Sequence, residues 1–168
     1  WGIPQILHWG EDLGGLTAAQ SQNFSRSQFS AVVSGNADIS PLFSLVPQQS
    51  EGWVGTPGLV GSRKGKTLFS AFNLTDMKLT YQGTDGAASA MSAKLHDMEA
   101  DIDLTLELEI VPSGIIRTRA TITNTGADGY QVDSLLLGLP TPATETHVLD
   151  QTGHHLRERD IQKHEFTI

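Results

Sequence analysis

Apolar and polar residues alternate with a period of two along several short stretches of this chain, most clearly between Ile102 and Val111. The apolar positions of that stretch are Ile102, Leu104, Leu106, Leu108 and Ile110. Successive side chains of a strand point to opposite faces of a sheet, so this pattern predicts a strand with one buried face.

A second alternating stretch, Ile115–Thr123, follows directly after Pro112-Ser113-Gly114, a three-residue turn. We therefore predict an antiparallel hairpin with one buried and one charged face. On the buried face Ile110 lies opposite Ile116 and Leu104 opposite Ile122, with Leu106 and Leu108 also buried. On the outer face Glu109 lies opposite Arg117 and Glu107 opposite Arg119.

Other short runs rich in β-branched and aromatic residues predict further strands, whereas no window predicts a convincing amphipathic helix. These strands are Phe29–Val33, Leu68–Phe72, Lys78–Gln82, Ala88–Asp97, Gln131–Leu137 and His147–Asp150. The nearest helical candidate, Leu13–Ser27, is polar and weakly periodic. Short strands separated by glycine- and proline-containing turns predict an all-β, antiparallel sandwich.

The segment Gln48–Lys66 interrupts this pattern with many glycines around one tryptophan, Trp53. It is typical of a long loop, or of a hairpin with a mobile tip. Glycine-rich loops on a rigid sandwich are common binding sites, so Trp53 is a candidate binding residue.

The composition excludes some classes of partner. The 168 residues include 11 basic and 19 acidic side chains, for a net charge of −8, and no cysteine. This balance argues against nucleic acid and anionic membranes as partners. Without cysteine there is no disulfide or thiolate metal site, which suits a reducing cytoplasm. The chain starts at Trp1 without methionine and stops within a patterned stretch, so we expect one domain, residues 1–168, truncated at both ends.

Two histidine-containing groups could carry chemistry, but their spacing favours structural roles. His8, Glu11 and Asp12 match no zinc pattern such as H-E-x-x-H. The second group is His147, His154, His155 and His164. Adjacent histidines on an extended chain point to opposite faces, which favours a solvated, alternating charged strand or a domain-interface segment over a metal site.

The acidic residues of the predicted hairpin do not form a hydrolytic pair. Glycoside hydrolysis needs two carboxylates flanking the scissile bond, roughly 5–10 Å apart. Asp103, Glu107 and Glu109 belong instead to a solvated face, with arginines opposite the glutamates. We therefore expect no catalytic residue, no metal and no cofactor in this chain.

Three stretches together indicate a family: ILHWGEDLG (6–14), PLFSLVPQQSEGWVGTPGLVGSRKG (41–65) and LDQTGHHLRERDIQKHEFT (149–167). In this order they resemble the N-terminal domain of bacterial α-galactosidases of glycoside hydrolase family 36. The third departs from the family pattern at His154, Ile161 and Lys163, where relatives carry arginine, proline and arginine.

The resemblance implies an antiparallel β-supersandwich of the galactose-mutarotase type, followed by a catalytic (β/α)₈ barrel and a C-terminal β domain that are not in this chain. It also implies a bacterial, cytoplasmic enzyme that hydrolyses terminal α-galactosyl groups of melibiose and raffinose with retention, through two barrel aspartates. Family members form homo-oligomers, often tetramers. The chain alone is then expected to be inactive. The residues do not distinguish α-galactosidase from α-N-acetylgalactosaminidase, or one oligosaccharide from another.

In tetrameric relatives a loop of this domain reaches a neighbouring active site, and the loop around Trp53 is similar in position. The aspartate and arginine that some relatives carry before the loop proline are missing from residues 52–57. Trp53 then either stacks on a sugar ring or packs within its subunit or at an interface. Two other readings stay open: a free-standing carbohydrate-binding module with Trp53 as its platform, and a scaffold or metal-binding domain that uses the C-terminal histidines.

Overall fold

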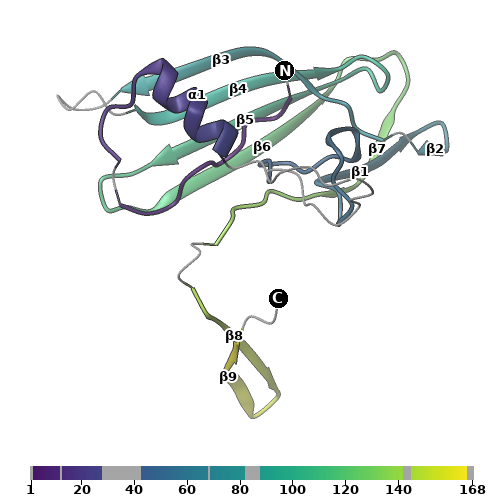
Figure 1. Ribbon diagram of the computed structural model, residues 1–168. Coiled ribbons are helices and arrows are strands. Elements are labelled where there is room, and N and C mark those ends of the chain that lie inside the picture. The colour runs from purple at the N-terminus through teal and green to yellow at the C-terminus, as the bar shows by residue number, and fades with distance from the viewer. Residues whose placement is uncertain are drawn as a thin grey trace, which may run out of the picture. The chain divides into compact units, whose positions relative to one another are not determined.

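A computed structural model describes residues 2–11, 13–27, 43–67, 69–81, 88–141 and 145–165. These residues divide into two compact units (Figure 1). The first comprises Trp1–His8 and Asp12–Pro140, and the second comprises Trp9–Glu11 and Thr141–Ile168. The described strands pair antiparallel throughout, which confirms the all-β class.

The larger sheet of the first unit has four strands in sequential order, β3-β4-β5-β6 (Figure 1). The strands are β3 (Asn73–Tyr81), β4 (Ala88–Asp97), β5 (Ile102–Ile110) and β6 (Ile116–Asn124). Each strand pairs with the next along the chain, so neighbours in the sequence are also neighbours in the sheet.

The β5–β6 hairpin has the predicted register. Ile110 pairs with Ile116, Leu104 with Ile122, Glu109 with Arg117 and Glu107 with Arg119. The prediction that all four inner residues are buried is wrong at the turn end, because Leu108 is only half-buried and Ile110 is 46% exposed. The core lies around Ile102 and Leu104 at the other end of the strand, so burial declines toward the turn.

A three-stranded sheet of order β2-β1-β7 completes the strands of the first unit. These strands are β1 (Leu59–Arg63), β2 (Lys66–Thr67) and β7 (Tyr130–Leu135). Lys64 and Gly65, both with positive φ, form the two-residue turn between β1 and β2. The segment Gln48–Lys66 is therefore a loop only as far as Gly58, and its second half is a strand and a hairpin turn.

One apolar cluster joins the two sheets, consistent with a β-sandwich. Its buried members are Ile3, Leu45, Val46, Leu59, Phe72, Ala93, Leu95, Ala100, Ile102, Leu104 and Leu106. Leu59 comes from the smaller sheet, while Leu95 and Leu104 come from paired positions of the larger one. The segment before β1, which contains the short 3₁₀ helix η1 (Gln49–Glu51), brings Leu45 and Val46 into the same cluster.

The segment predicted as a strand at Leu68–Phe72 is not one in its described part, Phe69–Phe72. Side chains satisfy its backbone instead of a neighbouring strand. The buried Gln48 accepts from the Phe72 amide at 3.0 Å and donates to its carbonyl at 3.3 Å. Asp97 accepts from the Ala71 amide at 2.7 Å. Because these contacts join residues far apart in the sequence, the local pattern of apolar and polar residues could not predict them.

A helix forms where the pattern predicted none, α1 (Ala18–Ser27). Thr17 caps it: its hydroxyl accepts from the Gln20 amide at 3.3 Å, and the Gln20 side chain accepts from the Thr17 amide at 2.9 Å. This is a capping box. Because no residue of α1 is buried, the helix forms without the apolar stripe by which a sequence pattern would reveal it. The strand predicted at Phe29–Val33 lies outside the described residues.

The second unit is a two-stranded antiparallel hairpin of β8 (His147–His154) and β9 (Arg157–Glu165) (Figure 1). The predicted strand at His147–Asp150 is the first half of β8. None of the described residues of this hairpin is buried, and most of them are charged or polar. The hairpin is therefore exposed within this chain, as both a solvated charged strand and a domain-interface segment would be.

Candidate functional site

Trp53, the predicted binding residue, lies just after η1 in the loop that precedes β1. Gly52 supplies the left-handed backbone (φ +88°) that turns the chain there. The indole Nε1 donates to the Thr56 carbonyl at 2.9 Å, and the ring meets Phe43 edge-on at 5.4 Å. The half-buried ring is therefore held by its own unit, and Val54 beside it is 84% exposed.

The carboxylates of the β5–β6 hairpin lie on the outer face of the larger sheet and pair with arginines as predicted. Glu109 contacts Arg117 at 2.6 Å and Glu107 contacts Arg119 at 3.8 Å. An open groove of about 600 Å³ runs over this face. Both glutamates line this groove, each with an arginine beside it.

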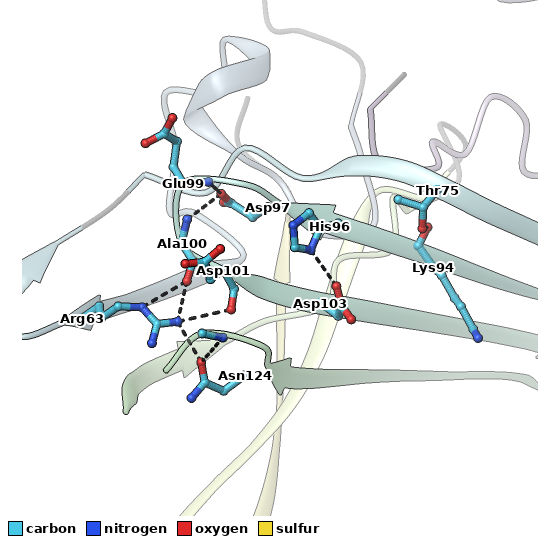
Figure 2. Close-up of polar contacts among 11 residues, drawn as sticks. Arg63, Thr75, Lys94, His96, Asp97, Glu99, Ala100, Asp101, Asp103 and Asn124 are labelled. Carbon is cyan, nitrogen blue, oxygen red and sulfur yellow. Dashed lines mark hydrogen bonds and ion pairs between the residues drawn. The ribbon is translucent and has the colours of Figure 1, made fainter. Parts of the chain in front are cut away.

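A histidine–carboxylate pair that the sequence reading missed lies on the same outer face. His96 of β4 and Asp103 of β5 are directly opposite, and Nδ1 and Oδ1 lie 2.7 Å apart. Figure 2 shows the two side chains pointing toward each other. The Thr75 hydroxyl, drawn in the same view, donates to the Lys94 carbonyl at 2.9 Å. The pairing of β4 with β5 was the signal that could have found this cross-strand contact.

Arg63, at the end of β1, is the centre of the densest polar cluster (Figure 2). Its guanidinium donates to the carbonyls of Ala100, Asp101 and Asp128 and to the Asn124 side-chain oxygen. Two of these acceptors belong to the β4–β5 turn, one to the last residue of β6 and one to the segment between β6 and β7. A single side chain thus ties the smaller sheet to two turns of the larger sheet, which is a structural role.

Tyr130 and Asp97 complete the surroundings of Arg63. The guanidinium lies 5.6 Å from the centre of the Tyr130 ring. Burial of the Tyr130 hydroxyl, with a smaller effect of the Asp97 carboxylate, raises the pKa of this tyrosine. Asp97 is fully buried and accepts from the backbone amides of Ala71, Glu99 and Ala100, so it caps the β4–β5 turn.

The C-terminal histidines are spread along the β8–β9 hairpin and pair with separate groups. His164 lies 3.5 Å from Asp150, His147 lies 3.9 Å from Glu165, and His154 Nδ1 is 2.8 Å from the His155 carbonyl. Across the described ranges, no three histidine or acidic side chains gather closely enough to hold a metal ion.

The members of the N-terminal group, His8, Glu11 and Asp12, fall in different parts of the structure's description. His8 belongs to the first unit, where its exposed ring meets Phe24 of α1 edge-on at 6.1 Å. Glu11 belongs to the second unit, and Asp12 lies outside the described residues.

No helix among the described residues is long and apolar enough to cross a membrane. No solved structure matches the chain significantly.

Two comparisons confirm the resemblance seen in the three sequence stretches. The family model of the glycosyl hydrolase family 36 N-terminal domain matches residues 2–168. The chain is also similar to an α-galactosidase of Escherichia coli, with 25% identity over 154 residues. That match covers 92% of this chain but 20% of the relative, so the chain spans about a fifth of its length. Since the family model covers nearly every residue, the chain belongs to the glycosyl hydrolase family 36 N-terminal domain family.

Proposed function

We propose that this chain is the non-catalytic N-terminal domain of a bacterial, cytoplasmic α-galactosidase that removes terminal α-galactosyl residues from oligosaccharides such as melibiose and raffinose. The observation that carries the proposal is the similarity to the E. coli α-galactosidase along 92% of the chain. That similarity takes up a fifth of the relative, which leaves ample chain outside it for a catalytic domain.

The chemistry of the described carboxylates supports a non-catalytic role. A retaining glycosidase needs a nucleophile and an acid/base carboxyl about 5–5.5 Å apart across a sugar site, with the pKa of the acid raised. Here Glu107 and Glu109 face arginines on an open sheet, and Asp97 is bound by three backbone amides. We therefore assign the nucleophile and the acid/base to the barrel of the parent protein.

The proposal includes a contribution of the Trp53 loop to an active site in a homo-oligomer of the parent. The indole edge is fixed by Thr56 and Phe43, so the ring has little rotational freedom left to lose on binding. A rigid aromatic surface beside an exposed tip is suited to stacking on the apolar face of a pyranose. Held this way, Trp53 would bind substrate and take no part in the bond cleavage.

The test is the substrate range of the purified parent protein. Release of galactose from melibiose and raffinose is expected, with no release from the matched β-galactosides. A parallel assay on an α-N-acetylgalactosaminide decides which terminal, non-reducing sugar the enzyme releases. A parent that cleaves neither melibiose nor raffinose, or that prefers the acetylated sugar, would contradict the proposed substrate.

A further inference from the structure

Two glycines lie against the rings of Phe43 and Trp53, which we call the aromatic pair. The ring centroids are 5.4 Å apart, with an interplanar angle of 78°. A Cβ atom added to Gly55 would lie 2.9 Å from Nε1, Cε2 and Cζ2 of the indole, and one added to Gly138 would collide with the Phe43 ring. A side chain at either glycine is therefore incompatible with the present positions of the two rings.

The backbone conformation of the loop does not explain the glycine at position 55. Gly52 and Gly65 have φ values of +88° and +74°, in the left-handed region that favours glycine, whereas Gly55 does not have a positive φ. An alanine at position 55 would therefore meet no left-handed backbone strain. The indole ring of Trp53 is what leaves no room for a Cβ atom there, so the missing side chain sets how closely the ring approaches the loop.

The indole cannot move aside at little cost, because other contacts hold it. Its Nε1 donates to the Thr56 carbonyl at 2.9 Å, and this donor is one of the three ring atoms that an added Cβ atom would crowd. The Phe43 ring limits movement in its own direction and is backed by Gly138, whose amide donates to the Leu45 carbonyl at 2.9 Å. A methyl group on Gly55 would therefore displace the indole or break its hydrogen bond.

We propose that Gly55 and Phe43 are positioning residues for substrate, which together hold the Trp53 ring against the loop backbone in the orientation that stacks on a sugar. This rests on the proposed function, because it needs the Trp53 loop to contribute to an active site of the parent. A stacking surface binds more tightly when its orientation is set before the sugar arrives, since less freedom is then lost on binding. Gly55 acts only through the indole and contacts neither the sugar nor the bond that breaks.

A double-variant cycle in the parent protein tests whether Gly55 acts through Trp53. The variants are Trp53→Ala, Gly55→Ala and the two together. Gly15→Ala is the matched control, because a Cβ atom on Gly15 meets no atom within 4 Å and its φ is not positive. The values of kcat and KM are measured on melibiose and raffinose, and melting curves establish that each variant folds.

Gly55→Ala is expected to lower kcat/KM at least about threefold, mainly through KM, while Gly15→Ala leaves it unchanged. In the Trp53→Ala background, Gly55→Ala should change kcat/KM by less than about twofold, since the ring that it displaces is gone. A normal kcat/KM for Gly55→Ala would overturn the proposal. A further loss in the double variant would also overturn it, because the methyl group would then act directly on the sugar or on a neighbouring chain. Phe43→Leu repeats the cycle if Gly55→Ala does not fold.

Tryptophan fluorescence of the 168-residue chain separates this proposal from the proposed function. Replacing the other two tryptophans, Trp1 and Trp9, with phenylalanine leaves Trp53 as the single emitter. Gly55→Ala is expected to raise the acrylamide quenching constant of Trp53, because the displaced ring loses part of its packing, whereas Gly15→Ala should not. Unchanged quenching in Gly55→Ala would overturn the proposal even for a fully active parent. A parent whose kinetics ignore Trp53→Ala would instead refute the proposed contribution of the loop, and the positioning role with it, whatever the quenching shows.

Discussion

At the scale of single residues, Arg63 has the largest structural role in the described part of the chain. Its planar guanidinium offers donors in a fixed fork, and three backbone carbonyls and one amide oxygen surround it. Removing it leaves those carbonyls unpaired, so Arg63→Ala is expected to lower the free energy of unfolding by about 3 kcal/mol. Denaturant unfolding measures this change.

The neighbouring Lys64 provides the matched control for Arg63. Its ammonium contacts Asp128 at 2.7 Å in solvent, with both side chains largely exposed. An exposed ion pair contributes less than about 1 kcal/mol, so Lys64→Gln should be nearly neutral. Equal effects of Arg63→Ala and Lys64→Gln would mean that the carbonyl cluster does not stabilise the fold.

Tyr130 makes the free energy of unfolding depend on pH in the alkaline range. Its pKa in the folded state lies above the ordinary tyrosine value of about 10 because burial disfavours the phenolate. The unfolded chain then releases the proton first, so this contribution is complete below pH 10 and is lost as pH rises through the folded-state pKa. Tyr130→Phe should give a shallower fall in stability above pH 10. An unchanged pH profile in this variant would exclude Tyr130 as the cause.

Trp53 is the residue at which packing and substrate binding make different predictions. If it stacks on a sugar in the parent, Trp53→Ala should lose about 1–2 kcal/mol of transition-state binding, which is roughly a 5- to 30-fold fall in kcat/KM. Its contacts with Phe43 and Thr56 also predict a lower Tm. Trp53→Phe keeps an aromatic face and should recover most of kcat/KM. Unchanged kinetics on melibiose and raffinose, whatever the Tm, would leave only the packing role.

At the scale of elements, the β5–β6 hairpin shows how burial depends on position along a strand. Leu106 is 1% exposed, whereas Ile110, on the same strand and face, is 46% exposed. Truncation of the buried residue creates a cavity, so Leu106→Ala should cost about 2–5 kcal/mol. Ile110→Ala in the 168-residue chain should cost less than about 1 kcal/mol, since its side chain is already half in water. A comparable loss at both positions would contradict the described burial.

The same elements show what could be predicted from the sequence. Alternation, turn and charge pairing act between neighbouring residues, so they predicted the register from Ile102 to Asn124 correctly. The exposure of Ile110 depends on where Leu45 and Val46 pack, and the loop at Phe69–Phe72 depends on Gln48. These are contacts between distant parts of the chain. In the candidate site, the glutamate–arginine pairs could be predicted from the hairpin pattern. The Arg63 cluster and the His96–Asp103 pair could not, because they depend on which strands lie side by side.

The β8–β9 hairpin, too, was predicted only in part from the sequence. Its charged alternation was visible in the sequence, but its length was not, because half of β8 follows the residues predicted as a strand. A two-stranded hairpin is marginally stable in isolation. Since no described residue of the hairpin is buried, we expect its backbone amides to exchange hydrogen faster than those of β5, as hydrogen-exchange mass spectrometry would show. Protection equal to that of β5 would reveal a packing partner for the hairpin.

At the scale of the whole molecule, we interpret the chain as a scaffold domain. Asp97, Arg63 and the glutamate–arginine pairs of the β5–β6 hairpin all have structural contacts. The match to the glycosyl hydrolase family 36 N-terminal domain agrees with a structural role for this chain.

The most direct test of this central claim is a parallel assay of the 168-residue chain and the parent protein on a chromogenic α-galactoside. The account predicts turnover by the parent and a rate for the chain that equals the buffer control at every protein concentration. Turnover by the chain above that control, abolished by replacing a single carboxylate such as Glu107 or Asp103 with its amide, would contradict it.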